Sequence, residues 1–514
     1  MSETRTHTLT IGETPRIVGA ARELKAAIRG ARRILGTDHP DRGSNAWAVQ
    51  KRHTSTGGPI LAGDCHMELA VPALWHEIGV RCPELSVRGF SIPGVPWVLA
   101  GHTGSAAWTM TGCATPQVTG NSDACTAVTD TSTCAESLSR LQRAHTATDV
   151  SASLDAWHAP LMHMVWADSN DAIGLRLCGM VPNLALPAAE SPPCGWIASA
   201  NDCAARRTHP ARELLERGAA PGWRAQRIRE LLARTTHADV RHHAAIQCDV
   251  ESVSARELRS VIVDRTTHGH ATPRSDPGRR LLAKLRAWDG RMDPNSPGAA
   301  ASAALSDIIS MLVAGHHHRH GPVPAGDLAG RVIGAEASAH ATPTASQALM
   351  IFHHAISRAD ETRTSRMCER AGVAHDIDEL IAWLLDSAAQ RLPADPAAWT
   401  LGTARTTRIR HRWMRLGKLG RIPGLNRAAS PGIAVMPGGC DTPWLTTGHD
   451  GASIGPVFRM VIDLADPDRS MAVLAGGQSG HSASGHATDQ LPLWIRGDTR
   501  PMPWSDAAID ESSV

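Results

Sequence analysis

The sequence contains no tyrosine and only three phenylalanines, although its 514 residues include 15 tryptophans and 27 histidines. Large aromatic packing must therefore come from tryptophan, and we expect imidazole rings to take over part of the hydrogen bonding that phenols supply. A surplus of either charge is also lacking, because 52 lysines and arginines nearly balance 50 aspartates and glutamates. This balance, with 42% apolar residues, excludes a disordered acidic chain and argues against a basic nucleic-acid-binding protein.

Long hydrophobic segments are missing too. No run approaches 18 uncharged apolar residues, and the first seven residues lead into no apolar segment of the signal-peptide kind. We therefore expect no membrane partner and a cytoplasmic location, or a periplasmic or secreted one if the natural N-terminus is missing. The 11 cysteines are scattered with no Cys-x-x-Cys pair, which argues against a zinc ribbon and a dense disulfide framework.

The hydrophobic pattern along the chain changes twice. Short apolar runs between 44 and 201 predict strands over 47–49, 60–62, 95–100, 106–110, 162–167 and 173–177. A helical period follows over about 210–398, and its clearest helix starts at Asp376 and ends before Pro393. Short apolar runs typical of strands return over 433–436, 458–464 and 471–475. Because strands and helices do not alternate, this order predicts an α+β, layered αββα domain with a helical insertion rather than a βαβ array.

The most informative segment for chemistry reads Gly43-Ser44-Asn45-Ala46-Trp47-Ala48-Val49, followed by Pro59-Ile60-Leu61-Ala62-Gly63-Asp64-Cys65-His66. A serine hydroxyl needs a base within hydrogen-bond reach, and no adjacent His or Lys supplies one in sequence. If the Gly43–Ser44 bond were cut, Ser44 would carry its own α-amine, whose pKa of about 7.7 to 8.0 leaves free base near neutral pH. Ser44 would then be nucleophile and base together.

This start and a series of later motifs resemble the penicillin acylase family of N-terminal-nucleophile amide hydrolases, mainly its catalytic β chain. The likeness extends over most of 44–504, and its motifs follow in family order. They are Leu74-Trp75-His76-Glu77, Pro93-Gly94, Gly101-His102 with Ala107-Trp108, Ala200-Asn201, Pro221-Gly222-Trp223-Arg224-Ala225, Trp288-Asp289-Gly290-Arg291-Met292-Asp293, Gly476-Gly477-Gln478-Ser479-Gly480 and Asp489-Gln490-Leu491-Pro492-Leu493-Trp494.

The resemblance implies roles for five residues. Ser44 matches the nucleophile exposed by autocatalytic cleavage after Gly43, and His66 matches a residue that supports the serine and its amine. Asn201 and the backbone amide of Gly112 match the two donors of the oxyanion hole. Arg224 matches an arginine that orders the asparagine and the terminal amine. Outside the resemblance, His66 would be a polar residue at a strand end, Asn201 a turn residue and Arg224 an exposed cation.

Several features depart from the family pattern. The stretch 112–119, where family members place calcium-binding carboxylates, has none, so we expect no calcium and no other cofactor. Asp202 replaces a usual Asn, and Cys65 stands where Pro is common. Only 43 residues precede Ser44, which we interpret as a short leader or residual α segment and propeptide, with the β-chain-like domain over 44–514. The family's longer α segment forms part of the acyl pocket, so a separate α chain is a possible partner.

We therefore expect an amide hydrolase that removes acyl groups from small N-acyl substrates such as β-lactams, acyl homoserine lactones or lipopeptides. The alternative is a truncated, non-catalytic relative that acts as a binding or scaffold protein. A third reading places a conventional serine hydrolase at Ser453 in Gly451-Ala452-Ser453-Ile454-Gly455, but that motif needs a following helix and is expected to form a turn.

Histidine-rich positions elsewhere carry weaker signals. His316, His317, His318 and His320 are expected in a solvated loop rather than at a metal. The pair His242-His243 falls in a helical stretch and is expected at the surface or at its boundary.

Overall fold

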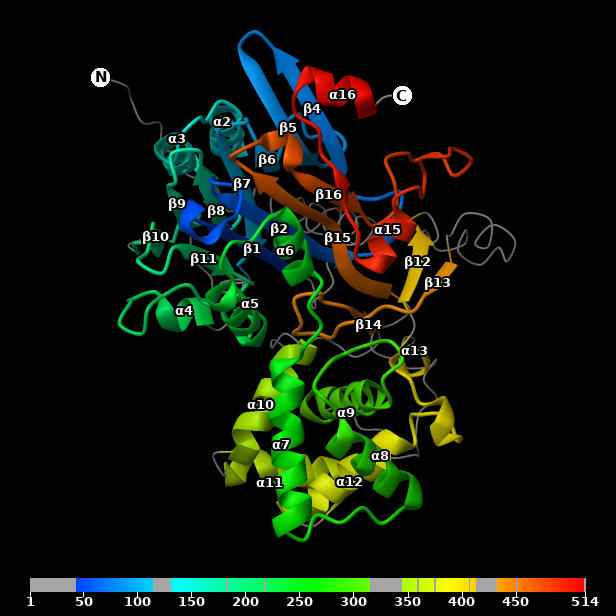
Figure 1. The fold of residues 1–514 in the computed structure, drawn as a ribbon. Coiled ribbons are helices and arrows are strands. Elements are labelled where there is room, and N and C mark those ends of the chain that lie inside the picture. Colours follow the sequence, from blue (N-terminus) through cyan, green and yellow to red (C-terminus); the bar gives the residue numbers. More distant parts are fainter. Residues whose placement is uncertain are drawn as a thin grey trace, which may run out of the picture.

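Two seven-stranded sheets form the upper half of the molecule in Figure 1. The computed structural model describes residues 43–113, 131–181, 184–216, 219–314, 344–357, 360–373, 376–405, 407–412, 432–449 and 452–512. Sheet 1 has the order β11 (Trp196–Ser199), β1 (Gly43–Val49), β2 (Ile60–Glu68), β15 (Ala452–Asp463), β16 (Met471–Leu474) and β17 (Arg500–Pro501), and β14 (Thr447–His449) also pairs with β15.

Sheet 2 and a small third sheet complete the strands of the described chain. Sheet 2 has the order β10 (Ala188–Glu190), β9 (Ile173–Cys178), β8 (Met162–Asp168), β7 (Ala106–Gly112), β6 (Ala100–His102), β5 (Leu85–Ser91) and β4 (His76–Cys82). The third sheet has the order β13 (Gly432–Ala434), β12 (Thr407–His411) and β3 (Ala70–Val71).

Alternation along the strands creates four layers. In β1, Ala46 and Ala48 face sheet 2, whereas Trp47 and Val49 pack against α5 (Trp223–Arg234) and α6 (Val240–Gln247). In β7, Ala107 faces sheet 1, and the opposite face of sheet 2 packs against α2 (Thr131–Leu141) and α3 (Ala147–Ser153). The expected αββα architecture is therefore confirmed, because two sheets share one apolar interior and each carries helices outside.

A helical lobe occupies the lower half of Figure 1. After the short α4 (Arg212–Glu216) and the pair α5 and α6, it comprises α7 (Val253–His268), α8 (Asp276–Ala287), α9 (Pro297–Ala314), α10 (Ala345–Ser357), α11 (Glu361–Ala371), α12 (Ile377–Ala389) and α13 (Leu401–Ala404). Among the described helices, α9 is the one long and apolar enough to cross a membrane, but it packs against α8, α10, α12 and α13 and more than half of it is buried. Its composition is thus accounted for by its place inside the lobe.

Local signals predicted most boundaries. Asp376 is the N-cap of α12 and accepts from Asp378 N, and the helix ends at Ala389, before Pro393. The strand expected over 95–100 is wrong, since only Ala100 lies in a strand. Gln142 bonds both backbone groups of Val98 (2.8 and 3.1 Å), so a side chain takes the place of a strand partner.

Imidazole rings are buried both between the two sheets and between sheet 1 and α6. His243 is fully buried and accepts from Trp47 Nε1 at 3.0 Å, so its expected surface position is wrong. Desolvation by burial lowers the pKa of His102 to about 3, of His163 to about 4 and of His243 to about 3. These rings are therefore neutral in the folded chain at ordinary pH.

We expect the free energy of unfolding to fall as the pH is lowered from about 7.5 to about 5. The three buried rings stay unprotonated in the native state, whereas each binds a proton near pH 6.5 once unfolded, so acid favours the unfolded chain. Urea unfolding at the two pH values measures this difference. His243→Gln should reduce it, with exposed His268→Gln as the control, and an unchanged pH dependence in His243→Gln would contradict the assignment.

Candidate active site at Ser44

Ser44 lies at the beginning of β1, between the two sheets. It pairs with Cys65 of β2, and strand alternation gives its side chain the same direction as Ala46 and Ala48, toward sheet 2. The residue is buried, and its Oγ donates to Gly43 O at 2.6 Å and lies 3.4 Å from Cys65 Sγ. The hydroxyl is therefore beside the carbonyl group of the Gly43–Ser44 peptide bond.

Asn201 follows directly after β11 and holds the backbone of Ser44. Its Oδ1 accepts from Ser44 N at 2.7 Å and from Arg224 Nη2 at 2.8 Å, and its Nδ2 donates to Gly112 O at 2.7 Å. These partners fix the orientation of the amide, because a flipped group would face two donors with its own hydrogens. The φ angle of Asn201 is +66°, a left-handed conformation that Asn adopts more readily than most residues.

Gly112, at the end of β7, brings sheet 2 to the site. Cys113 N donates to Leu161 O at 3.2 Å, so the alternation of the antiparallel ladder directs the N–H and C=O of Gly112 away from β8. The C=O meets Asn201 there. The Gly112 N–H therefore lies on the same side of β7 as Asn201 Nδ2.

Arg224 lies in the first turn of α5, which starts after Gly222 in the left-handed conformation (φ +94°). Its Nη1 donates to Ser44 O at 2.6 Å and to Asn45 Oδ1 at 2.8 Å. Burial lowers its pKa to about 10, against the opposing effect of Asp64, Asp202 and Asp441. Arg224 is therefore a buried cation at neutral pH, not the exposed one that its helix composition would suggest.

Gly43 leaves room for this cation. A Cβ built on Gly43 would lie 2.8 Å from Arg224 Nη2 and 3.1 Å from Asn201 Oδ1. Contacts of this length are closer than van der Waals packing allows, and both partners are held by other hydrogen bonds. A side chain at position 43 would therefore displace the groups that hold Ser44.

His66 is not brought to Ser44. It pairs with Gly43, so its ring lies on the helix-facing side of sheet 1, opposite to Ser44 Oγ, and no hydrogen bond joins the two residues among the described contacts. Its Nε2 lies 2.7 Å from Asp64 Oδ1. Burial lowers its pKa, although Asp64 opposes this effect. The structure therefore places His66 beside Asp64 and not beside Ser44, and its expected support of the serine stays a prediction.

Asn45 and Asp64 are the site residues that sequence reasoning missed. Asn45 Nδ2 donates to Asp64 Oδ1 at 2.8 Å and to Pro443 O at 2.9 Å, and its Oδ1 accepts from Arg224. The two side chains meet because Asn45 and Asp64 are paired between β1 and β2. Both residues lie in the two sequence segments that contain Ser44 and His66, which was the available signal. Only the register of β1 against β2 shows that their side chains meet.

The remaining candidates lie elsewhere. Ser453 is inside β15, where its carbonyl accepts from Leu69 N at 2.8 Å and the residue pairs with Gly448 of β14. The expected turn is therefore wrong from Ala452 onward, and no strand-to-helix elbow forms. The histidines at 316–318 and 320 lie outside the described residues.

Metal binding is not indicated within the described part of the chain. No group of three or more His, Cys, Asp or Glu side chains there is arranged to hold a metal ion. The stretch expected to lack calcium ligands, 112–119, lies outside the described residues from 114 on. The expectation of no calcium therefore stays a prediction.

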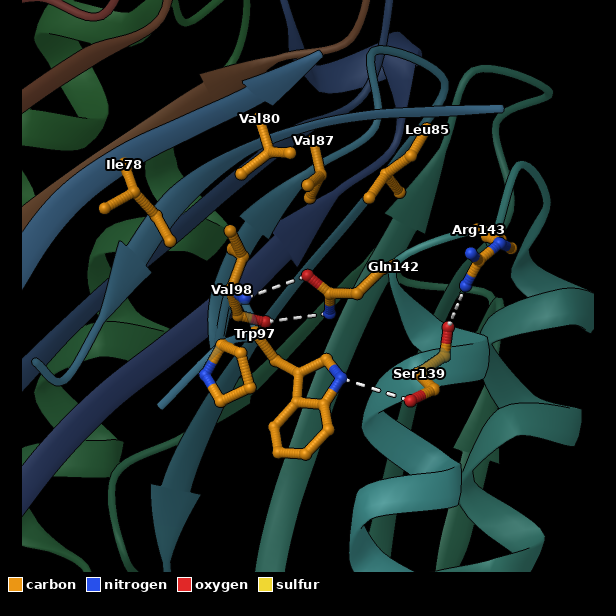
Figure 2. A pocket seen from close by; sticks show the side chains of 10 residues that line it. Ile78, Val80, Leu85, Val87, Trp97, Val98, Ser139, Gln142 and Arg143 are labelled. Carbon is orange, nitrogen blue, oxygen red and sulfur yellow. Dashed lines mark hydrogen bonds between the residues drawn. The ribbon is translucent and has the colours of Figure 1, made fainter. Parts of the chain in front are cut away.

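A pocket of about 250 Å³ lies on the other side of sheet 2 (Figure 2). It is lined by the β4–β5 hairpin, by Trp97 and Val98 and by α2, where Trp97 Nε1 donates to Ser139 Oγ at 3.1 Å. Val87 and Val98 belong to the apolar layer under α2, whereas Ser44 faces the space between the sheets. This pocket is thus separate from the Ser44 site.

Comparisons with known proteins identify a family of similar sequences. The sequence profile described as penicillin amidase matches residues 8–120, 118–185 and 179–511. Penicillin acylase 2 proenzyme from Pseudomonas sp. (strain SE83) is 24% identical over 97% of this chain and 70% of its own length. Acyl-homoserine lactone acylase QuiP from Pseudomonas syringae pv. syringae is 23% identical over 90% of this chain and 66% of its own. The chain thus spans about two thirds of these relatives.

A solved structure shows the same fold. A thermostable penicillin G acylase from Alcaligenes faecalis superposes with a TM-score of 0.60 at 14% identity, over 91% of this chain and 98% of that chain. At this identity the likeness concerns the fold, which is the layered arrangement of sheets described above.

We expect Arg224→Met to lower the midpoint of thermal unfolding by about 3 °C or more. The substitution leaves Asn45 Oδ1 and Ser44 O buried without their donor, and breaking a buried charged network costs about 3 kcal/mol or more. Arg234→Met, at the exposed end of the same helix, is the matched control. Equal midpoints for the two variants would show that Arg224 does not hold the site together.

Proposed function

The chain belongs to the penicillin amidase family, a family of amide hydrolases, and on this basis we propose that it removes acyl groups from N-acyl compounds through Ser44. The observation that carries the proposal is the position of Ser44. Its Oγ lies 2.6 Å from Gly43 O, while its N and O are held by Asn201 and Arg224. A nucleophile fixed on both sides of its own backbone is suited first to cut the preceding bond and then to act from the new N-terminus.

The first step would be cleavage of the Gly43–Ser44 bond in the uncut chain. Ser44 Oγ attacks the Gly43 carbonyl carbon, the C–N bond breaks and an ester forms while the nitrogen takes up a proton. Water then hydrolyses the ester, leaving a carboxylate on Gly43 and a free α-amine on Ser44. Arg224 and Asn201 would hold the Ser44 backbone through both stages.

The second step would use the new amine as the base. It takes the proton from Ser44 Oγ as the hydroxyl attacks the acyl carbonyl, and returns it to the leaving amine. The Arg224 cation nearby would favour the unprotonated amine. The Gly112 N–H and Asn201 Nδ2 would stabilise the oxyanion, and water would release the acid.

The substrate class follows from the relatives. Their names identify acylases of penicillins and of acyl homoserine lactones, and both substrates are small molecules with an acyl group on nitrogen. We propose the same class here, with acylated lipopeptides as a third possibility. A separate α chain could supply part of the acyl pocket.

We expect Ser44→Ala to remain uncut and to hydrolyse no acyl substrate. The variant keeps the fold but loses the hydroxyl required in both steps. Intact mass and N-terminal sequencing report the cleavage, and release of the amine from penicillin G and from N-decanoyl homoserine lactone reports hydrolysis. Ser453→Ala is the control and should behave as the wild type.

Two outcomes would overturn the proposal. An uncut wild-type chain that is inactive on both substrates would favour the non-catalytic alternative, in which the protein binds rather than hydrolyses. Activity that survives Ser44→Ala but not Ser453→Ala would move the nucleophile to β15.

We expect Gly43→Ala to slow cleavage by about tenfold or more. The added methyl group would meet Arg224 Nη2 and Asn201 Oδ1 and shift the groups that position Ser44. The fraction of cut chain over time, measured by mass spectrometry, tests this. Gly485→Ala, where a Cβ has open space and the backbone is not left-handed, is the control for an alanine at an exposed loop glycine. Equal rates for Gly43→Ala and the wild type would contradict the steric argument.

A further inference from the structure

The proposed oxyanion donors come from two different sheets. Asn201 follows β11 of sheet 1, together with Ser44 on β1, whereas Gly112 ends β7 of sheet 2. Catalytic donors must hold their positions to within about 0.5 Å, but apolar contacts between packed sheets have no direction. The Asn201–Gly112 hydrogen bond is one directional link between the sheets, and a second link beside it would fix the relative position of the two donors.

Three polar side chains meet between the sheets at this place. Thr111 Oγ1 lies 2.8 Å from Ser199 Oγ, and His163 Nδ1 lies 3.2 Å from Ser199 Oγ and 3.4 Å from Thr111 Oγ1. Thr111 and His163 are paired between β7 and β8, whereas Ser199 is paired with Ala46 in sheet 1. All three are at most 2% exposed. The Thr111–Ser199 hydrogen bond thus crosses from one sheet to the other in a dry layer.

We propose that Thr111, Ser199 and His163 are positioning residues that hold the two halves of the oxyanion site together. This inference rests on the proposed function of Ser44. Thr111 directly precedes Gly112, and Ser199 stands two residues before Asn201, so each hydroxyl fixes the strand that carries one donor. His163 joins both hydroxyls through a single ring nitrogen.

The neutral state of His163 is consistent with its proposed positioning role. Burial lowers its pKa to about 4, against the opposing effect of Asp202, so at neutral pH its Nδ1 is part of an uncharged network. An uncharged network avoids the penalty of a buried charge between the sheets. The ring can therefore orient the two hydroxyls without disturbing the charges around Ser44.

Substitutions that preserve side-chain packing can distinguish a positioning role from a general loss of stability. Thr111→Val replaces the hydroxyl by a methyl group of similar size, and Ser199→Ala removes its partner. The double variant removes both hydroxyls but leaves His163 Nδ1 buried without a partner, so its stability should not exceed that of the more stable single variant. Its catalysis should not recover either, because the Thr111–Ser199 link stays absent and the Asn201–Gly112 hydrogen bond is left without this support.

The experiment compares Thr111→Val, Ser199→Ala and the double variant with the wild type. We expect kcat to fall about 10-fold to 100-fold in each variant, with KM within about twofold of the wild-type value. The reason is that a displaced donor stabilises the oxyanion of the transition state less well. The double variant should be no slower than the slower single variant. Thr111→Ser should restore kcat to within about threefold. Thr109→Val, also buried and facing sheet 1 from the same strand, is the matched control and should keep the wild-type kcat.

The probes are penicillin G and N-decanoyl homoserine lactone, and the rate of Gly43–Ser44 cleavage is a second readout at the same site. A wild-type kcat in Thr111→Val, or a change confined to KM, would overturn the positioning role. A wild-type chain that neither cuts itself nor hydrolyses either probe would instead overturn the proposed function, and the inference with it.

Discussion

The buried guanidinium of Arg224 is the interaction on which the Ser44 site depends. Taking a cation out of water is unfavourable, so every acceptor around it must be in place. It is satisfied by Ser44 O, Asn45 Oδ1 and Asn201 Oδ1, and these belong to two neighbouring strands of sheet 1. The same three bonds fix the nucleophile Ser44, the proposed oxyanion donor Asn201, and Asn45, which donates to Asp64. Stability and chemistry therefore share one set of contacts.

Much of the fold follows from local patterns, because alternating apolar residues and capping signals act over a few positions. The strands around Trp47, Ala62 and Val165 and the cap at Asp376 are of this kind. The segment before Ala100 is different: a distant side chain, Gln142, satisfies the backbone of Val98, and no local pattern predicts that.

The site could be predicted only in part. The structure brings Ser44, Gly112, Asn201 and Arg224 together, and the roles that the family resemblance implies for them stay predictions. His66 could not be placed correctly from sequence, because a strand residue reaches one face or the other according to a register that only the fold defines. The same register explains why Asn45 and Asp64 were missed. The lack of tyrosine indicated that histidines would take over hydrogen bonds that phenols usually make. His243, buried and bonded to Trp47 Nε1, is an example.

The path of the chain gives the helical lobe a mechanical relation to the nucleophile. The chain leaves the sandwich after α5 and α6 and returns through the segment that contains Pro443. Arg224 of α5 and Pro443 both bond Asn45. The outgoing and returning segments are also joined to each other, because Trp444 N donates to Asp249 O at 2.9 Å and Ser252 Oγ to Asp441 at 2.9 Å. The lobe is thus a loop whose two ends are tied beside Ser44. Unfolding of the lobe would disturb the contacts of Asn45 with both Arg224 and Pro443, so we expect the lobe and the nucleophile to unfold together.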